Sequence, residues 1–318
     1  MIIYLEKIFK LIGEQGTEGD LTVGKPYSTA LGYREAAQAV FDFEKELALA
    51  HMTKVEHRDP IKTWNKSSFE TLVERTKPTS PTWSEYLTTG VKPIDGTYLD
   101  LTRLFTEMGY DPAGMGEVNC ATYEAVGKVV KMANPGNLAT IKHYLIAKYV
   151  KSCASYLSKD FFNTHFEFWS KEMQGVKEVK ERWKRALDAQ MSHLSDCMGK
   201  IYAARYFNEK CREKAMEVVA NVKVALRERL LEVEWMSEET RKEALIKMES
   251  FNCKIGYPDD GAWIDYTGLD LSDSDPVANA MACSAHLERI DMEQCNKPTR
   301  REKWLMPCQM INAYYHPM

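Results

Sequence analysis

Apolar residues recur at helical spacing over most of this sequence, and this pattern restricts the fold more than any other feature. Helices are predicted at residues 137–156, 176–207, 209–233 and 277–290. In the first of these, one face carries a row of large side chains: Leu138, Ile141, Leu145, Tyr149 and Tyr156. Alternating apolar and polar residues, which mark a half-buried strand, occur at few places. The sequence therefore predicts a mainly α-helical fold.

Helical patterns also cover the N-terminal part of the chain. Residues 1–12 form an amphipathic pattern, and residues 27–52 form another whose inner face is expected to comprise Ala36, Val40, Phe43 and Leu47. Ser67 and Glu70 have the spacing of a capping box, in which each side chain bonds a backbone N–H at a helix start. Ser80 is followed by a proline, which fits a first helical turn, so another short helix is expected there.

The stretch from Trp235 to Asp260 contains local signals for a helix start and a helix end. Ser237 is expected to be the N-cap, and two glutamates follow it at the positive end of the helix dipole. Gly256 and Pro258 are expected to end the helix, because glycine tolerates a left-handed exit and proline cannot continue a helix. The buried stripe is predicted to comprise Thr240, Ala244, Leu245 and Met248, with Arg241, Lys242 and Lys247 outside.

Charge and hydropathy argue against nucleic-acid binding and against a membrane-spanning segment in this chain. Net charge is -4, and basic and acidic residues are interleaved along the chain. Nucleic-acid-binding domains usually carry a basic patch or stripe, so nucleic acid is not an expected partner. No uncharged apolar run approaches the ~18 residues that span a bilayer, and residues 1–12 contain too many charges for a signal-peptide core. The sequence predicts no signal or transmembrane segment within this chain.

The common catalytic motifs are absent from the sequence. It contains no GxSxG elbow, no P-loop and no GxGxxG after a strand. None of the seven histidines is followed by glutamate and no two are four residues apart, so the zinc-binding HExxH motif is absent. No catalytic residue and no metal ligand is therefore predicted here.

Two weaker groups of metal-ligand residue types are present. Cys283, His286 and Cys295 lack a fourth ligand, so a structural role is the favoured interpretation. The acidic residues of the loops lack the terminal glutamate of an EF-hand and are interpreted as solvated: Asp259, Asp260, Asp270, Asp273 and Asp275. The eight cysteines include no CxxC pair, and composition leaves open whether they are disulfides or buried thiols.

The best functional candidate is the segment from Met310 to Tyr315, which has strand propensity. An exposed strand pairs with an extended peptide through backbone groups, and the amide of Asn312 supplies one donor and one acceptor beside it. The alternative is an internal strand whose partner is missing from the chain. The residues of this segment favour neither the peptide-binding strand nor the internal strand over the other.

Several blocks of residues add a resemblance to a known family. Two blocks are the most specific. The first comprises Trp235-Met236, Thr240-Arg241, Ala244, Lys247 and Ile255-Gly256-Tyr257-Pro258-Asp259. The second comprises Trp304, Met306, Pro307, Asn312-Ala313-Tyr314-Tyr315 and Pro317. Further matches are Phe43-Glu44, Leu47, Arg58-Asp59-Pro60, Asn65, Gly199, Tyr202 and Phe207. Taken in chain order, these residues extend over nearly the whole chain and resemble the neprilysin and endothelin-converting-enzyme family of zinc metallopeptidases.

The resemblance implies a two-lobed, mainly helical ectodomain with a thermolysin-like catalytic lobe. Residues 1–298 would be most of the helical N-terminal lobe, incomplete at its start, and residues 299–318 the beginning of a truncated catalytic lobe with its first strand. In the family, the asparagine and alanine of the last block bind the backbone of the peptide substrate. By resemblance these roles fall on Asn312 and Ala313.

The sequence also departs from the family. The family's HExxH helix, its glutamate ligand and its histidine and arginine that stabilise the transition state lie beyond the last block. The family's transmembrane anchor and first cysteines are also missing from this chain. Trp183 is followed three residues later by Ala186 where the family commonly has cysteine, so no disulfide pattern is transferred. Zinc is thus expected in the full-length family enzyme and not on this chain.

Three functional interpretations follow. The first is a portion of a zinc metalloendopeptidase that cleaves small extracellular peptides, inactive without its missing catalytic lobe. The resemblance then places it outside the cell or at the plasma membrane, attached only through an anchor that this chain lacks. The alternative is a non-catalytic helical module that binds peptides or other partners. The third is a structural helical domain with no peptide affinity.

Overall fold

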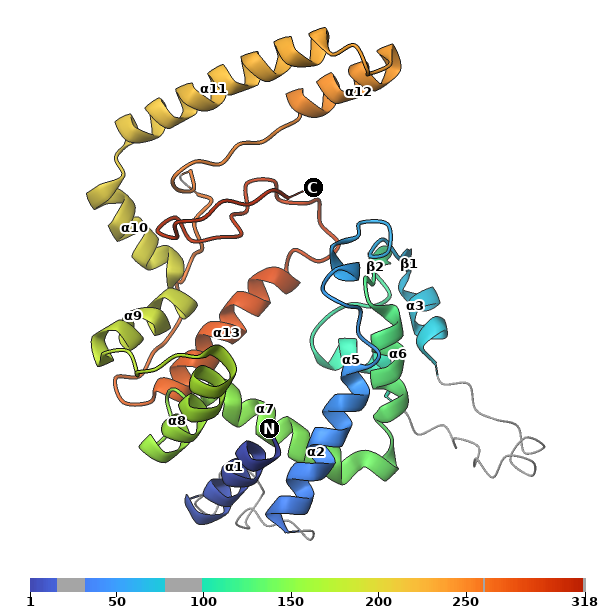
Figure 1. Cartoon of the computed structure of the whole chain (residues 1–318), viewed down its shortest axis with the longest axis vertical. Helices are drawn as coiled ribbons and strands as arrows, with labels where there is room; N and C mark the ends of the chain where they lie inside the picture. The colour runs from blue at the N-terminus through green and yellow to red at the C-terminus, as the bar shows by residue number, and fades with distance from the viewer. Residues whose placement is uncertain (16–31, 78–98, 260, 317–318) are drawn as a thin grey trace, which may run out of the picture. The chain divides into compact units, whose positions relative to one another are not determined.

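The computed structural model describes residues 1–15, 32–77, 99–259 and 261–316 (Figure 1). Within these ranges the elements are helices, apart from one two-stranded sheet. The expectation of a mainly α-helical fold is confirmed. The helix expected from Ser80, the side chain of Asp260 and residue Pro317 lie outside the described residues. No helix in the described ranges is long and apolar enough to cross a membrane.

The chain divides into two compact units, which are described one at a time. Unit 1 comprises Met1–Val179, Asp273–Val277 and Arg289–Lys297, and unit 2 comprises Lys180–Ser272, Ala278–Glu288 and Pro298–Met318. The division at residue 298 that the resemblance implies stays a prediction.

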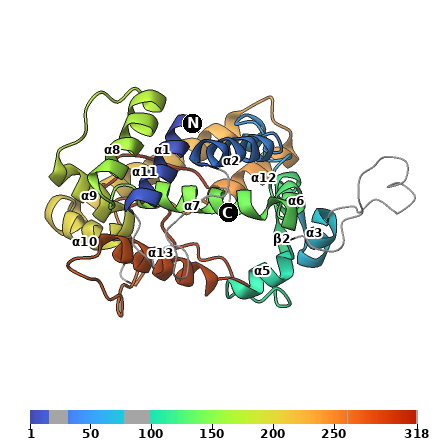
Figure 2. The same ribbon diagram turned by 90° about the horizontal axis from the view of Figure 1, so that it is seen from below.

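The main core of unit 1 lies between α1 (Ile2–Gln15), α2 (Tyr33–Ala48), α7 (Leu138–Cys153) and α8 (Lys159–His165). Figure 2 shows α1 and α2 beside each other with α7 across them. The amphipathic pattern at the start of the chain is confirmed, since α1 buries one stripe composed of Tyr4, Leu5, Ile8, Phe9 and Ile12. The facing stripe of α2 is Ala36, Ala37 and Val40, and its small alanines let the two helices approach closely.

The buried face of α7 differs from the predicted one. Leu138 and Leu145 are exposed, and the inward side chains are His143, Ile146, Ala147, Val150 and Cys153. Apolar residues occur on more than one side of this helix, so their spacing fits two faces. The contacts of α7 with α1 and α2 decide which face is buried.

The aromatic run after α7 belongs to the core of unit 1, as interpreted from the sequence. Phe161 is buried in α8, and the π-helix η3 (Phe166–Glu172) follows it. The ring of Phe168 stacks on Tyr4 with centroids 5.0 Å apart, and Trp169 meets the same ring edge-on at 6.1 Å. The Lys151 ammonium lies 3.3 Å from the centroid of the Trp169 ring. These rings are packing groups.

A small sheet organises the rest of unit 1. Strand β1 (Lys66–Ser68) pairs antiparallel with β2 (Glu117–Asn119) and leads directly into α3 (Phe69–Thr76). The expected capping residue is off by one position: Ser68 accepts the N–H of Thr71, whereas Ser67 pairs with Val118 in the sheet. The remaining elements here are α5 (Leu101–Glu107), α6 (Tyr123–Met132) and the 3-10 turn η2 (Pro135–Asn137).

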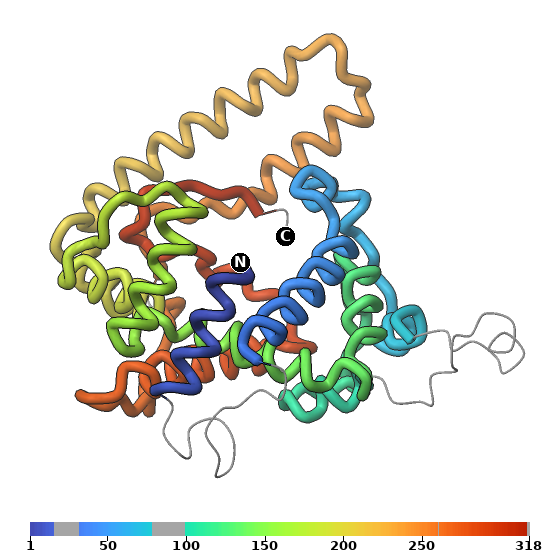
Figure 3. The backbone as a smooth tube through the Cα atoms, turned by 60° about the horizontal axis from the view of Figure 1, so that its bottom comes forward, coloured from blue at the N-terminus to red at the C-terminus, as the bar shows by residue number. Residues whose placement is uncertain are grey.

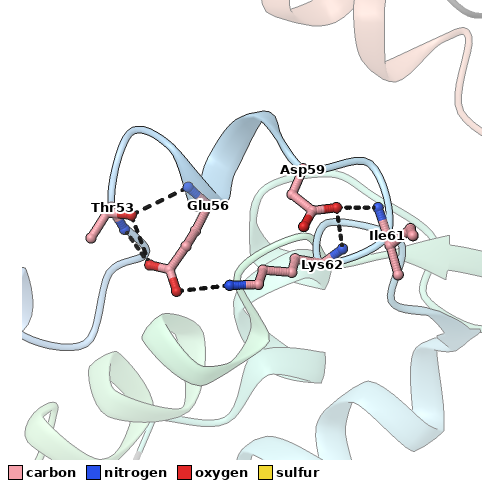
Figure 4. Close-up of polar contacts among 5 residues, drawn as sticks. All are labelled: Thr53, Glu56, Asp59, Ile61 and Lys62. Atoms are coloured by element: carbon pink, nitrogen blue, oxygen red, sulfur yellow. Dashed lines mark hydrogen bonds and ion pairs between the residues drawn. The ribbon is translucent and has the colours of Figure 1, made fainter.

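A capping motif that the sequence analysis missed precedes the sheet (Figure 4). The Glu56 carboxylate accepts hydrogen bonds from the backbone N–H and the hydroxyl of Thr53, at 3.0 and 2.8 Å, at the start of η1 (Glu56–Arg58). The Thr53 hydroxyl in turn accepts the N–H of Glu56. The Lys62 ammonium binds the other carboxylate oxygen at 3.0 Å. The signal was the spacing Thr-x-x-Glu, which is that of a capping box.

Unit 2 contains α9 (Arg182–His193), α10 (Ser195–Tyr206), α11 (Glu209–Glu232) and α12 (Glu238–Glu249), and most of α13 (Pro276–Met292). The single helix predicted over 176–207 is wrong, because Leu194 leaves the helical region (φ -126°, ψ 40°) and separates α9 from α10. Helices α11 and α13 match their predictions within two residues. Figure 3 shows α12 returning alongside α11.

The end of α12 was predicted too far along the chain. The helix ends at Glu249, with Ser250 as its C-cap, and not at Gly256. Gly256 instead adopts φ +78° in the following loop. A second difference concerns residues 310–316, which form no strand in the described structure. A strand exists only when its backbone pairs with a neighbour, and no described segment pairs with this one.

Candidate peptide-binding site

A groove of about 580 Å³ in unit 2 contains the candidate residues Asn312 and Ala313. One wall is the end of α12 and the loop after it, and the other is the C-terminal segment. The lining residues are Val219, Lys247, Ser250, Phe251, Asn252, Cys253, Lys254, Ile255, Gly256, Arg301, Trp304, Met306, Pro307, Cys308, Met310, Asn312, Ala313, Tyr314, Tyr315 and His316. The two most specific sequence blocks thus meet at one site.

Helix α12 is positioned by contacts at its N-terminus. The Ser237 hydroxyl accepts the N–H of Thr240 at 3.2 Å, which confirms the predicted cap. Arg241, predicted to point outward, is half-buried, and its guanidinium donates to the carbonyl of Val233 at 2.8 Å. Val233 is the C-cap of α11, whose last carbonyls have no partners within the helix. A cation there also complements the helix dipole, so Arg241 joins α11 to α12.

The predicted buried stripe of α12 is confirmed only in part. Met248 is buried, Ala244 and Leu245 are half-buried, and Thr240 is exposed. Thr240 is in the first turn of α12, where its hydroxyl bonds the side chain of the capping residue Ser237 at 2.9 Å. The signature of this helix therefore reflects its capping contacts more than its apolar face.

The loop after α12 is tied to the C-terminal segment through backbone carbonyls. The Asn252 amide donates to the carbonyl of Arg301 at 3.1 Å, and the Arg301 guanidinium donates to the carbonyl of Ser250 at 3.3 Å. The Lys254 ammonium donates to the carbonyl of Lys303. These reciprocal bonds hold the two walls of the groove at a fixed separation.

Tight packing on α10 anchors the C-terminal segment just before Asn312. The Gln309 amide donates to the carbonyl of Ser195 at 3.1 Å, and the Cys308 thiol donates to the carbonyl of Gly199 at 3.4 Å. A Cβ at position 199 would lie 2.9 Å from the Cys308 sulfur, so only glycine fits there without movement. Burial raises the pKa of the Cys308 thiol. Gly199 is thus needed at this close approach.

The loop at Gly256 is fixed from the other side by aromatic and charged contacts. A Cβ at position 256 would collide with the ring of Phe207, and the positive φ also favours glycine. The Tyr257 hydroxyl donates to Glu209 at 2.5 Å, a hydrogen bond that raises the pKa of Tyr257. Arg212 bonds Asp259 at 2.5 Å and lies 4.9 Å from the Tyr257 ring centroid. This cluster docks the loop on the start of α11.

The two candidate residues are exposed at the groove and contact each other. The side-chain oxygen of Asn312 accepts the backbone N–H of Ala313 at 2.8 Å. The Asn312 NH2 group and the Ala313 carbonyl have no hydrogen-bond partner among the described residues. One donor and one acceptor are therefore available side by side, a combination that suits a peptide backbone.

Two tyrosines follow these residues. The Tyr314 hydroxyl accepts the N–H of Leu305 at 3.4 Å, and the Tyr315 ring meets Phe251 edge-on at 6.5 Å between centroids. Both contacts connect the end of the segment to the rest of the groove. They hold Asn312 and Ala313 in place without a neighbouring strand.

The other residues singled out from the sequence form no metal site in the described structure. Among the described residues, no group of three or more His, Cys, Asp or Glu side chains is placed to hold a metal ion. His286 bonds the carbonyl of Asp265 at 2.7 Å and stacks on Tyr266, and Cys283 is buried near it. The eight cysteines are unpaired in this structure.

Comparison with known proteins decides the family. The sequence profile described as peptidase family M13 matches residues 2–258 of this chain. The chain belongs to peptidase family M13. The resemblance to the neprilysin and endothelin-converting-enzyme family is thereby confirmed, and the match lies in the helical N-terminal part of the family's proteins.

Curated relatives place the chain within this family. It is 29% identical to a neutral endopeptidase of Lactobacillus helveticus over 191 residues, which are 59% of this chain and 29% of that protein. It is 26% identical to human endothelin-converting enzyme 1 over 293 residues, 89% of this chain and 35% of the enzyme. Neprilysin-11 of Caenorhabditis elegans is 25% identical over 320 residues, 99% of this chain and 35% of that protein. The chain spans about a third of the length of these relatives.

Solved structures show the same fold. The crystal structure of Mycobacterium tuberculosis zinc metalloprotease Zmp1 in complex with an inhibitor has a TM-score of 0.78, with 23% identity over 99% of this chain and 42% of that one. PepO from Lactobacillus rhamnosis has a TM-score of 0.70, with 19% identity over 91% of this chain and 42% of that one. At these identities the likeness concerns the fold alone.

Proposed function

We propose that this chain supplies the peptide-binding groove of a neprilysin-like zinc metalloendopeptidase that cleaves small extracellular peptides. The observation that carries the proposal is the groove in which the two most specific family blocks meet around Asn312 and Ala313. Family membership supports a peptide as the ligand. Proteolysis belongs to the complete enzyme, of which this chain spans about a third of the expected length.

Asn312 and Ala313 have complementary roles in this proposal. The Asn312 NH2 group donates to a carbonyl of the bound peptide, and the Ala313 carbonyl accepts a peptide N–H. The hydrogen bond from the Ala313 N–H to the Asn312 oxygen engages only the oxygen of this amide, so its NH2 group is available to the peptide. Such a pair recognises backbone and is indifferent to side chains.

The zinc ion of the family has no set of ligands among the residues described here. The 318 residues contain no HExxH motif, and no described group of His, Cys, Asp and Glu fits a metal. The residues of this chain therefore bind and orient the peptide, and the catalytic lobe of the full-length enzyme carries the zinc. In this proposal residues 1–298 are the helical lobe and residues 299–318 begin the catalytic lobe, on the outside of the cell.

The alternative is a non-catalytic peptide-binding module. It is favoured by the one observation that the groove walls are held together within this chain, through Asn252, Lys254 and Arg301. The two proposals share the groove and differ in whether a catalytic lobe acts on the bound peptide.

Peptide titration tests the shared part of both proposals. Binding of a rhodamine-labelled heptapeptide to the 318-residue chain is measured by fluorescence anisotropy for the wild type, Asn312→Ala and the control Asn221→Ala, an exposed position on α11. Loss of one hydrogen bond is expected to weaken binding about three- to tenfold in Asn312→Ala alone. Equal affinity of all three proteins, or no binding by the wild type, would contradict the proposal.

Hydrolysis separates the enzyme portion from a complete enzyme. The purified chain is expected to leave the peptide intact after incubation with added zinc, as measured by mass spectrometry. Cleavage that a chelator abolishes would show that this chain binds catalytic zinc by itself and would overturn the assignment.

A further inference from the structure

The described side chains that line the groove and carry a full charge are all of one sign. Lys247, Lys254 and Arg301 line it, and among the residues that the structure describes no aspartate or glutamate does. The chain as a whole has net charge -4, so an all-cationic groove is opposite in sign to the average of the protein. The groove is therefore a local exception to the charge of the chain.

These three cations are held in the groove without a carboxylate. Lys254 and Arg301 donate to the backbone carbonyls of Lys303 and Ser250, and Lys247 is exposed at the end of α12. None of the three forms an ion pair with a described carboxylate. A carbonyl carries no net charge, so these contacts leave Lys254 and Arg301 without an ion-pair partner.

Glu302 is the carboxylate that acts on the charge of Lys254, and it does not cancel this charge. Glu302 lies near Lys254, but its carboxylate accepts a hydrogen bond from Arg300 at 2.8 Å and does not line the groove. Burial lowers the pKa of Lys254 more than Glu302 raises it, as expected for a cation partly removed from water. A carboxylate of a bound peptide can therefore form ion pairs with these cations.

Aromatic side chains share the groove with these cations. Phe251, Trp304, Tyr314 and Tyr315 line it, and two of them are in contact, Phe251 and Tyr315. Aromatic surface binds apolar side chains, whereas cations bind carboxylates. The combination suits an extended peptide that carries both kinds of side chain.

We propose that this groove selects acidic peptides, in which aspartate or glutamate side chains lie against Lys247, Lys254 and Arg301. The inference rests on the proposed function, since Asn312 and Ala313 bind the backbone of the same peptide. The backbone pair provides affinity for any sequence, and the three cations provide the preference among sequences. Lys247 contributes through a free, exposed ammonium, whereas the other two also hold the loop.

Two peptides and two matched variants test this selection. The rhodamine-labelled heptapeptides are identical, except that two glutamates of the first are glutamines in the second. Both are titrated against the wild type, Lys247→Gln and Lys242→Gln by fluorescence anisotropy at low salt. Lys242 is on the same helix and exposed, but does not line the groove, so it controls for the change in net charge. Circular dichroism checks that the variants are folded.

The wild type is expected to bind the acidic peptide about three- to tenfold more tightly than the neutral one, because exposed ion pairs are individually weak. Lys247→Gln should reduce this ratio about two- to fivefold, with little change for the neutral peptide, and Lys242→Gln should leave it unchanged. Raising the salt concentration from ~0.05 to ~0.5 M should reduce the wild-type ratio toward one.

The outcomes separate this inference from the proposed function. Equal binding of both peptides, with both weakened by Asn312→Ala, would overturn the acidic preference and leave the backbone site standing. An equal loss of the ratio in Lys242→Gln and Lys247→Gln would assign the preference to the general field of the protein and overturn the role of the groove. If neither peptide binds, the proposed function fails, and the acidic preference with it.

Discussion

The core of unit 1 and the α11–α12 pair of unit 2 are both helical, but they are stabilised in different ways. In unit 1, Ile8 and Phe9 of α1 are completely buried against α2 and α7. In unit 2, the 24-residue helix α11 has no buried residue, and Val218 and Val222 are about 60% exposed. Tertiary packing therefore stabilises the core of unit 1, whereas local contacts stabilise much of the α11–α12 pair.

Those local contacts lie at the helix ends. The Asn208 side chain accepts the N–H of Cys211 at the start of α11, and Arg241 binds the carbonyl at its end. Ser237 caps α12 in the same manner as Asn208 caps α11. The groove lies in this second region, so its geometry depends on caps and loop contacts more than on a core.

The largest expected effect is in the core of unit 1. Phe9→Ala removes a fully buried ring and is expected to lower the free energy of unfolding by about 3–5 kcal/mol. The matched change Val222→Ala on the exposed face of α11 should cost less than about 0.5 kcal/mol. Urea denaturation followed by circular dichroism measures both. A similar cost at the two sites would break the distinction between the regions.

An intermediate effect is expected at the loop that shapes the groove. Gly256→Ala introduces a side chain at φ +78° and against the Phe207 ring, so a loss of about 2–4 kcal/mol is expected together with weaker peptide binding. Gly268→Ala is the control, because φ is +81° there but, apart from its chain neighbours, no described residue has an atom within 4 Å of the added Cβ. It should cost about 1–2 kcal/mol and preserve binding. Equal losses would show that Phe207 does not constrain the loop.

The smallest effect is a pH dependence at the capping motif of unit 1. Hydrogen bonds from Thr53 and Lys62 lower the pKa of Glu56 from 4.5 to about 2. Since the pKa in the folded state is the lower one, the stabilisation is fully present above pH 4.5 and is lost as the pH falls toward 2. The carboxylate is exposed, so solvent screening keeps the effect small.

Urea midpoints between pH 6 and pH 2 measure this contribution. The midpoint of the wild type is expected to fall more steeply over the acidic part of the range than that of Glu56→Gln, which has no titratable group at this position. Parallel curves for the two proteins would show that the bonds in Figure 4 do not favour the charged form.

Short-range signals were sufficient for much of the helical fold and for the location of the candidate site. The Ser237 cap and the extents of α11 and α13 follow from side chains within a few residues of each helix end. The blocks around Gly256 and Asn312 indicated the family, which the match over residues 2–258 confirms. Whether Asn312 and Ala313 bind a peptide stays a prediction.

Other features were decided only by contacts between residues far apart in the sequence. The buried face of α7 depends on α1 and α2, and the inward turn of Arg241 depends on where α11 ends. Gly256 is required by the ring of Phe207, 49 positions away, and not by the end of a helix.

Local sequence thus indicated most of the helical segments, because capping and periodicity act over one or two turns, and the order of the residue blocks indicated the family. Only the tertiary structure decided that a single groove contains the loop after α12 and the segment around Asn312, and that Lys247, Lys254 and Arg301 meet there. Hydrogen bonds to distant backbone carbonyls create that arrangement, and such carbonyls leave no mark on the sequence because every residue has one.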